Sequence, residues 1–153
     1  MSALYIMVGL PGSGKSTYAK ETLLKANPDW AYVSRDEVRY QYVSDQEHYF
    51  DKEDEVYREF CNRIEMYLLQ DKNVIADATH LTAGSRKKLM NKLKVKPDKM
   101  YAIFMDTPFD TCMARNAERT GITRVPDQQM YRMKNGFKRP EHYEGFETIY
   151  RIH

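Results

Sequence analysis

Cysteine is scarce in this chain of 153 residues, which contains only Cys61 and Cys112. The two lie far apart and in no spacing typical of metal ligands, which argues against a disulfide framework and a zinc site. Long apolar runs are also missing, since none approaches the ~20 residues that a membrane-spanning helix needs. The sequence therefore predicts a soluble protein that does not have a membrane as a partner.

The first residues lack the features of a targeting segment. Met1 leads directly into an apolar stretch, without a basic leader and without a small-residue cleavage site after it. We therefore expect no signal peptide and a cytoplasmic location. Repeats, low-complexity segments and an interdomain linker are missing as well, and the length suits one domain with its own core. The prediction is a single domain over residues 1–153.

A strong net charge of either sign is absent. The chain has 24 Lys and Arg against 22 Asp and Glu, which leaves a formal net charge of +2 and a pI near 8.4. This balance falls short of a generally basic nucleic-acid binder. It permits a local cationic site for phosphate.

Short apolar runs alternate with segments of helical periodicity along the chain. We expect strands over residues 3–8, 30–34, 73–78, 100–105 and 148–152, the last at a sheet edge. We expect helices over residues 15–26, 53–69, 83–93, 109–119 and 126–135, and a helical segment beginning at residue 35. Apolar runs of this length suit strands that are buried on both faces of a parallel sheet. The order predicts a three-layer α/β fold with right-handed crossovers and about five parallel strands.

Residues 9–16 read GLPGSGKS and form a complete phosphate-binding motif between the first predicted strand and the first predicted helix. The pattern G-x-x-x-x-G-K-S/T is met by Gly9, Gly14, Lys15 and Ser16. Glycines allow successive N–H groups to point at an anion, and the helix that follows directs its positive dipole end there. A glycine-rich turn without a ligand is the alternative, and the strand–loop–helix context argues against it.

The same motif assigns the expected cofactors, ATP and Mg²⁺. Lys15 would reach the β- and γ-phosphates of a nucleoside triphosphate, while the Ser16 hydroxyl would hold Mg²⁺. The remaining contacts of the loop with the nucleotide are expected from Pro11, Gly12, Ser13 and Thr17.

Residues that bind the phosphate acceptor must come from other strand ends that face the nucleotide. Asp36 and Arg39 follow the second predicted strand and share one face of a helix. A carboxylate there could accept a hydroxyl proton while the guanidinium orients a phosphate. The alternative is that Asp36 caps the helix and that Arg39 pairs with it on the surface.

Asp77 ends the third predicted strand, within the segment DATH over residues 77–80. It could bind Mg²⁺ through water, or hold Arg39 or the substrate, although the second acid of a Walker B motif is missing. A strand-end acid that caps the next turn is the alternative. His80 has no further metal-ligand pattern around it, which favours a structural role.

Arg115 and Arg119 lie one turn apart on the predicted helix 109–119. They precede the connector 120–125, and residues 115–135 are a candidate lid. Arginines on a lid would neutralise charge on the transferred group. A solvated helix face is the alternative, and it is the favoured interpretation for Arg124 and Lys134.

Five segments together resemble the kinase domain of 5′-hydroxyl polynucleotide kinases, over almost the whole chain: GLPGSGKS, SRDEVR, DATHL, RNAERTGITRVP and FKRPEHYEGFETIYRI. The resemblance implies an adenylate-kinase-like P-loop fold with a helical lid. It implies that Asp36 is the general base and that Arg39 binds the acceptor's phosphate. It assigns further roles to Asp77 and Thr79 on the substrate side, to Arg119 as the essential lid arginine, with Arg115 one turn before it, and to Val125 as the residue that packs on the acceptor nucleobase.

The sequence thus predicts a phosphotransferase that moves the γ-phosphate of ATP to the 5′-hydroxyl of a single-stranded nucleic-acid end. Two departures from the family are that His80 stands where Asn is frequent and that the lid is one residue longer than in some members. A kinase of a small hydroxyl compound, such as a nucleoside or metabolite, stays open. So does a regulatory P-loop ATPase, although Asp36 on the acceptor side argues against it.

Overall fold

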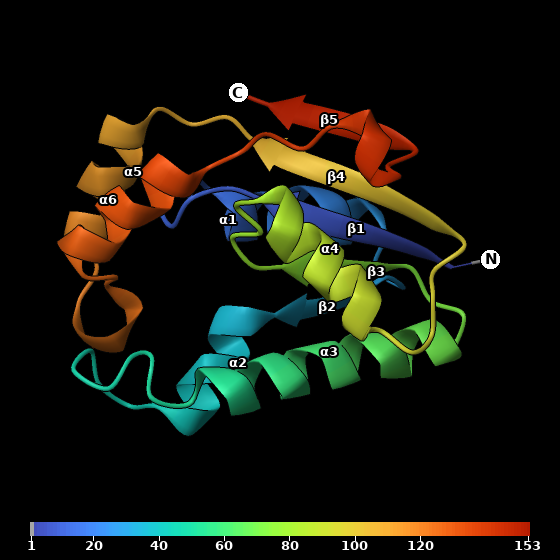
Figure 1. The fold of residues 1–153 in the computed structure, drawn as a ribbon, viewed down its shortest axis with the longest axis horizontal. Coiled ribbons are helices and arrows are strands. Elements are labelled where there is room, and N and C mark those ends of the chain that lie inside the picture. The colour runs from blue at the N-terminus through green and yellow to red at the C-terminus, as the bar shows by residue number, and fades with distance from the viewer. Residues whose placement is uncertain (1) are drawn as a thin grey trace.

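A fully parallel five-stranded sheet forms the centre of the molecule (Figure 1). The computed structural model describes residues 2–153, so Met1, where the predicted domain begins, lies outside the described residues. The strands lie in the order β2-β3-β1-β4-β5, and all four neighbouring pairs are parallel, which confirms the predicted sheet and places β5 at its edge. The bounds are Ala3–Val8 for β1, Ala31–Ser34 for β2, Val74–Asp77 for β3, Lys99–Met105 for β4 and Thr148–Ile152 for β5.

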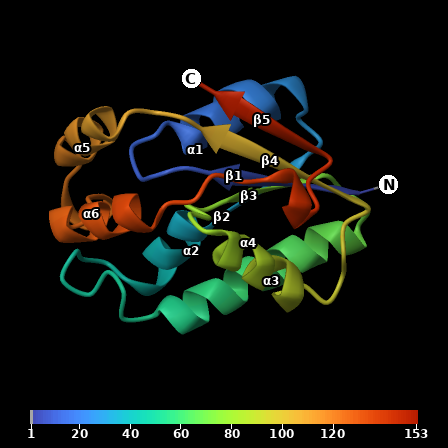
Figure 2. The same cartoon turned by 45° about the horizontal axis from the view of Figure 1, so that its top comes forward.

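Alternation of the side chains along β1 explains why helices cover both faces of the sheet. Leu4 and Ile6 pack in a cluster with apolar residues of α3 (Glu53–Leu69) and α4 (Ala83–Lys92). Met7 points to the opposite face and packs there with residues of the helix that follows β1. Successive side chains of a strand point to opposite faces of its sheet. The result is the expected three-layer α/β/α arrangement, which Figure 2 shows from a second side.

The helix that follows β1 differs from the expected regular helix over residues 15–26. It begins as α1 (Lys15–Tyr18) and continues as a π-helical segment, Ala19–Leu24. Ala19, Leu23 and Leu24 still face the sheet in this segment. Because the widened turn leaves the apolar contacts in place, the spacing of apolar residues did not distinguish it from an α-helix.

Loops from several strands meet at the carboxyl edge of the sheet because the strand ends are in register. Ser34 pairs with Asp77 at the ends of β2 and β3, and Val8 pairs with Phe104 near the ends of β1 and β4. α2 (Arg35–Tyr42) begins directly after β2 at this edge. The remaining helices, α5 (Phe109–Ala117) and α6 (Asp127–Gly136), lie beyond the same edge (Figure 1).

A buried arginine ties the C-terminal segment to the loop after β3. Arg86 on α4 is bound through Nε and Nη2 to the two carboxylate oxygens of Glu144, at 2.7 and 3.1 Å. It also donates from Nη1 to the His80 carbonyl at 2.7 Å and from Nη2 to the Arg139 carbonyl at 3.2 Å. Burial alone raises the pKa of Glu144, but the hydrogen bonds from Arg86 outweigh burial and hold that pKa below its ordinary value.

None of the described helices combines the length and the apolar character that a membrane crossing requires.

Candidate active site

The phosphate loop is held open by two glycines and by its neighbours. Gly12 and Gly14 have φ values of 80° and 91°, a region that side chains disfavour. A Cβ added to Gly12 would also lie 2.6 Å from the carbonyl oxygen of Cys112. Thr107 donates from Oγ1 to the Ser13 carbonyl at 2.7 Å, which ties the loop to the segment after β4. The loop conformation therefore requires glycine at Gly12 for two independent reasons.

Lys15 is the first residue of α1, and its side chain turns back along the loop. It is only 7% exposed, and its Nζ lies 3.5 Å from the Leu10 carbonyl oxygen. The side chain lines a hollow beside the loop. This is the position from which a lysine reaches the terminal phosphates of a bound nucleotide.

Ser16, Asp77 and Tyr32 form a compact oxygen cluster at the strand ends. The Ser16 hydroxyl donates to Asp77 Oδ2 at 2.7 Å, and the Tyr32 hydroxyl donates to the same oxygen. Burial raises the pKa of Tyr32, and the charge of Asp77 raises it further, so Tyr32 keeps its proton. Among residues 2–153, Asp77 makes no hydrogen bond to Arg39.

This cluster fits a P-loop magnesium site. Mg²⁺ prefers hard oxygen ligands and is usually held by one or two protein groups together with waters and phosphates. A hydroxyl and a carboxylate that already meet match that donor set. A dedicated cage of three or more His, Cys, Asp or Glu does not occur in the described part of the chain.

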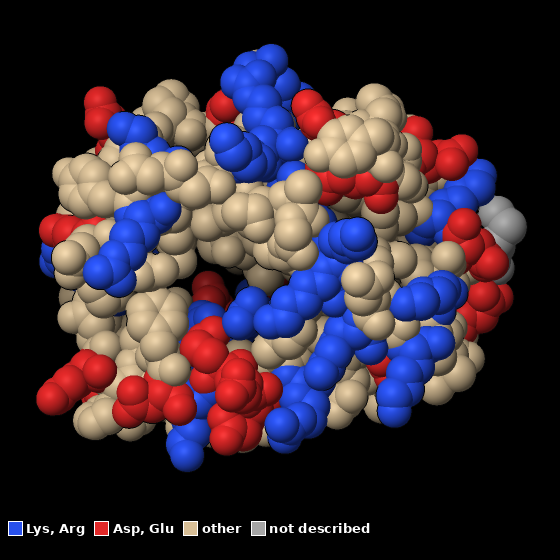
Figure 3. Space-filling view, in the orientation of Figure 1, with Lys and Arg blue, Asp and Glu red and all other residues tan. Residues whose placement is uncertain are grey.

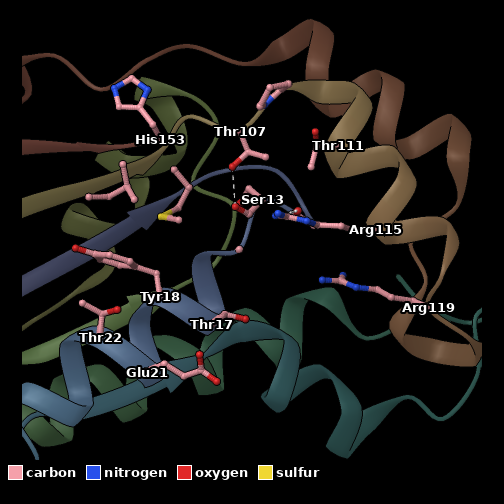
Figure 4. A pocket seen from close by; sticks show the side chains of 15 residues that line it. Ser13, Thr17, Tyr18, Glu21, Thr22, Thr107, Thr111, Arg115, Arg119 and His153 are labelled. Carbon is pink, nitrogen blue, oxygen red and sulfur yellow. Dashed lines mark hydrogen bonds between the residues drawn. The ribbon is translucent and has the colours of Figure 1, made fainter.

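The larger hollow beside the loop has a volume of about 680 Å³. Figure 4 shows Arg115 extending into it from α5 and Arg119 from the segment just after that helix, which ends at Ala117 and not at the predicted residue 119, with Thr17 and Glu21 on the opposite wall. Arg115 donates from Nη1 to the Gly12 carbonyl at 3.1 Å, whereas Arg119 has no ion pair among the described residues. Both predicted lid arginines therefore lie on the side of the loop that would hold the nucleotide.

A second hollow, of about 200 Å³, borders the same loop at Pro11 and Lys15. Asp36, Arg39 and Thr79 all line it, so the structure brings these three predicted acceptor residues together. We call it the acceptor hollow after this prediction. The cap of α2 is Ser34, whose hydroxyl accepts a hydrogen bond from the Glu37 N–H at 3.2 Å. Asp36 is therefore not the helix cap, and the capping interpretation of that residue is wrong.

Arg39 is buried in the wall of this acceptor hollow, with 6% of its surface exposed. It is bound to Asp36 through Nη1 and to Glu53 through Nε at 2.6 Å and Nη2 at 3.1 Å. Its Nη1 also donates to the Tyr49 hydroxyl at 3.0 Å, and its guanidinium lies 4.5 Å from the centre of the Tyr49 ring. Burial alone would lower the pKa of Arg39, but the bonds to Glu53 and the neighbouring charges raise it above its ordinary value.

Val125 lies apart from both hollows. It is 2% exposed and packs with Cys112 and Met130, and both of its backbone groups bond the Asn116 side chain, at 2.7 and 3.0 Å. The rings that line the acceptor hollow belong instead to Tyr49, which is buried, and to Phe50, which is 42% exposed. The structure thus does not bring Val125 together with Asp36 and Arg39.

Sequence reasoning missed several residues of this wall, above all Glu53, Tyr49 and Phe50. Glu53 is the first residue of a long amphipathic helix, where an acid is common because the helix dipole favours it. Tyr49 and Phe50 lie in a segment, residues 43–52, without periodicity. The only available signal was two adjacent aromatic residues in a polar stretch.

Comparison with known protein families identifies the family of this chain. A family model described as an AAA domain matches residues 4–140. The chain belongs to this family. This family match and the P-loop at the carboxyl end of β1 together confirm the expected P-loop kinase fold.

A curated relative of this AAA domain is L-seryl-tRNA(Sec) kinase of Methanococcus maripaludis, which is 28% identical over 141 residues. The match covers 90% of the chain but 53% of the relative, so the chain spans about half of the length of that protein.

Solved structures show the same fold. A chain of the Pnkp1/Rnl/Hen1 complex is 26% identical with a TM-score of 0.65, covering 74% of this chain and 38% of that one. A fungal RNA kinase has a TM-score of 0.70 at 12% identity and covers 100% of this chain and 38% of its own. A gluconokinase from Sinorhizobium meliloti 1021 has a TM-score of 0.63 at 15% identity, and the match covers 98% of this chain and 82% of the gluconokinase chain. At these low identities the last two show the fold alone.

Proposed function

We propose that this AAA domain transfers the γ-phosphate of ATP to the 5′-hydroxyl end of a single-stranded polynucleotide. The observation that carries the proposal is the acceptor hollow, where Asp36 stands beside Arg39 and close to Lys15. A carboxylate, a phosphate-binding guanidinium and the phosphate-loop lysine are the groups that in-line transfer to a hydroxyl needs. They line a different hollow from the larger one, and the larger one suits the nucleotide.

On the donor side, backbone N–H groups of the phosphate loop and the Lys15 ammonium bind the β- and γ-phosphates. Mg²⁺ held at Ser16 and Asp77 supplies positive charge beside these phosphates. Arg115 holds the Gly12 carbonyl and thereby braces the loop. Arg119, with its guanidinium directed into the nucleotide hollow, stabilises the charge that develops on the transferred group. We also propose that residues 115–135 move as the lid of one kinase domain.

On the acceptor side, the Asp36 carboxylate accepts the proton of the 5′-hydroxyl. The 5′-oxygen bonds to the γ-phosphorus as the bond from that phosphorus to the bridging oxygen of ADP breaks, so the products are a 5′-phosphate and ADP. Arg39 binds the phosphate that follows the terminal nucleoside and holds the hydroxyl in line. This division of roles uses every charged group in the hollow except Glu53 and Arg35.

Three features of the acceptor hollow favour a nucleic-acid end over a free small molecule. Arg39 and Arg35 place two cations in its lining, and Phe50 presents an exposed aromatic ring, which suits a phosphate next to a base. Its volume of about 200 Å³ is small, because pockets that enclose a whole ligand measure about 300–1,000 Å³. An acceptor that inserts only its end fits such a hollow.

A second candidate acceptor is the seryl hydroxyl of an aminoacylated tRNA. The curated relative at 28% identity is named for that substrate, and its hydroxyl is also carried at the end of an RNA. The phosphoryl transfer would use the same Asp36 and Lys15. Phe50 does not distinguish the two candidates, because the nucleoside that carries the seryl ester also offers a ring, so the acceptor screen must separate them.

The experiment is an acceptor screen with γ-labelled ATP and Mg²⁺. Parallel reactions contain a 5′-hydroxyl oligonucleotide, the same oligonucleotide with a 5′-phosphate, seryl-tRNA, and gluconate. We expect label only on the 5′-hydroxyl oligonucleotide, with a KM that rises steeply with salt because phosphate contacts release counterions. Label on seryl-tRNA or gluconate alone would replace the proposed acceptor, and hydrolysis of ATP with no labelled acceptor would favour a regulatory ATPase.

A further inference from the structure

A third hollow borders the phosphate loop, of about 290 Å³, and no role described above uses it. Three phenylalanines, Phe104, Phe109 and Phe137, and two cations, Lys134 and Arg139, are prominent in its lining. These residues come from β4, α5, α6 and the segment after α6. We call this the aromatic hollow.

Cations and rings are paired within the aromatic hollow. The Lys134 Nζ lies 4.6 Å from the centre of the Phe109 ring, and the Arg139 guanidinium lies 5.8 Å from that of Phe104. Phe104 and Phe137 stack with centres 5.4 Å apart. Such contacts are what a flat ligand ring replaces or extends.

The charge of the lining is positive. Lys134 and Arg139 are exposed, and neither has an ion pair in the described part of the chain. The acid of the lining, Asp106, is bound to Arg151 through Oδ2 and is thereby neutralised. An occupant that matches this hollow combines an aromatic ring with a negative charge.

The aromatic hollow is the neighbour of the acceptor hollow. Leu10 lines the first and Pro11 the second, and on α6 Lys134 lines the first and Met133 the second. At both places, consecutive residues line different hollows, so the two hollows are adjacent. Figure 3 shows an opening in this face of the molecule, between the α5–α6 end and α4, with Lys and Arg side chains on both sides of it.

We propose that the aromatic hollow is a subsite for the second nucleotide of the acceptor strand. Its base lies against the phenylalanine rings, and the phosphate on its 3′ side lies between Lys134 and Arg139. This inference rests on the proposed function, since it places one end of the strand at Asp36. A strand that leaves the acceptor hollow across the Pro11 and Met133 boundary enters this hollow next, and each of its nucleotides carries the ring and the charge that the lining matches.

The test measures binding rather than phosphate transfer. Oligonucleotides of one, two and three nucleotides, with a 5′-hydroxyl and a fluorescent label attached through a 3′-phosphate, are titrated with protein in the presence of ADP and Mg²⁺ and followed by anisotropy. Wild type should bind the dinucleotide roughly tenfold more tightly than the mononucleotide, because one more base stacks. The third nucleotide should add little.

The test variants are Lys134→Ala combined with Arg139→Ala, and separately Phe109→Leu. Both should abolish the gain from one to two nucleotides while leaving the affinity for ADP unchanged. Each lost phosphate contact should also flatten the dependence of log affinity on log salt by about 0.7. Arg132→Ala, which removes an exposed α6 charge outside the lining, is the matched control and should change neither quantity. Thermal unfolding checks that each variant is folded.

The outcomes separate the subsite from the reaction. If wild type phosphorylates oligonucleotides but the variants bind one and two nucleotides as wild type does, the subsite is refuted and the proposed function stands. If oligonucleotides bind with the expected length and variant dependence but receive no label, the subsite stands and the proposed acceptor fails. If no oligonucleotide binds, or if free AMP competes as well as the dinucleotide, the strand subsite is refuted.

Discussion

Glu53 binds Arg39 through two parallel hydrogen bonds, from Nε to Oε1 at 2.6 Å and from Nη2 to Oε2 at 3.1 Å. A guanidinium held in this forked geometry has one orientation. Glu53 Oε2 also accepts a bond from Arg35 Nη2 at 2.9 Å. One carboxylate, at the start of α3, thus orients both arginines of the acceptor hollow.

Replacing this carboxylate should weaken acceptor binding specifically. In Glu53→Gln the two arginines lose their shared charged partner, so we expect the KM for the oligonucleotide to rise roughly tenfold, the size of one charge-assisted bond. The KM for ATP should stay the same. Steady-state kinetics with each substrate varied provide the measurement. Glu55→Gln, an exposed change on the same helix, is the control. An unchanged acceptor KM in Glu53→Gln would count against this positioning role.

Asp36→Asn should remove the base without removing the nucleotide site. The amide still occupies the hollow but accepts no proton at neutral pH, so transfer should fall by about 10²–10⁴-fold. ATP affinity, measured by calorimetry, should equal that of wild type. Glu37→Gln changes the next residue, an exposed acid paired with Lys20, and should retain activity. Full activity in Asp36→Asn would assign the base elsewhere.

Asp77→Asn should reduce magnesium binding, because the amide brings no charge to the oxygen cluster with Ser16. We expect the Mg²⁺ concentration at half-saturation of nucleotide binding to rise roughly tenfold, while binding of ATP without Mg²⁺ stays unchanged. Tyr32→Phe keeps the carboxylate but removes one hydrogen bond to it and should produce a smaller rise. A titration of Mg²⁺ against a fluorescent ATP analogue gives both values. Equal curves for Asp77→Asn and wild type would place Mg²⁺ away from Asp77.

Arg119 and Arg115 should behave differently although they lie one turn apart. Arg119→Ala removes a charge without an ion pair and should lower kcat by about 10³-fold or more, as for other arginines that stabilise phosphoryl transfer. Arg115→Ala releases the Gly12 carbonyl and should mainly raise the KM for ATP. Steady-state kinetics distinguish the two, with Arg132→Ala as the control. The same kinetic effect in both variants would show that they act as one charged surface.

His80 should make stability depend on pH. Its Nδ1 lies 2.8 Å from the Met7 carbonyl, its Nε2 has no partner, and burial lowers its pKa to about 4. Between pH 6.5 and 4 the unfolded chain binds a proton that the folded chain does not. The stability is therefore complete above pH 6.5 and is lost as pH falls towards 4, by up to roughly 3 kcal/mol.

The comparison variant for this prediction is His80→Asn, measured by urea unfolding at pH 7.5 and pH 5. The residue has a φ of 46°, which Asn adopts readily, so the variant should fold. Its stability should change less between the two pH values than that of wild type. An equal change in both proteins would show that other groups account for the acid sensitivity.

The elements of the fold could be predicted closely because each is specified by neighbouring residues. The apolar run at residues 3–8 and the periodicity of residues 53–69 match β1 and α3 as the structure has them. The phosphate loop is equally local, since Gly12 and Gly14 adopt conformations that only glycine adopts easily. Position after a strand end indicated Asp36 and Arg39, the resemblance to kinases added Thr79, and the structure brings all three into one hollow.

Val125 illustrates that local sequence patterns do not predict the environment of a side chain. A valine before a proline in a polar connector looks the same whether its side chain meets a ligand or packs against Met130. The structure places it in the second environment because Asn116 binds both of its backbone groups. Phe50, in a segment without periodicity, presents the exposed ring at the acceptor hollow.

The sequence by itself determined the phosphate loop, the order of strands and helices, and the kinase-like motifs, because each depends on residues close together in the chain. Only the tertiary structure decided which distant residues meet: Glu53 with Arg39, Tyr32 with Asp77, and the phenylalanines with Lys134 and Arg139. The strand order β2-β3-β1-β4-β5 sets those meetings. No local preference encodes the side-chain distances that result from it.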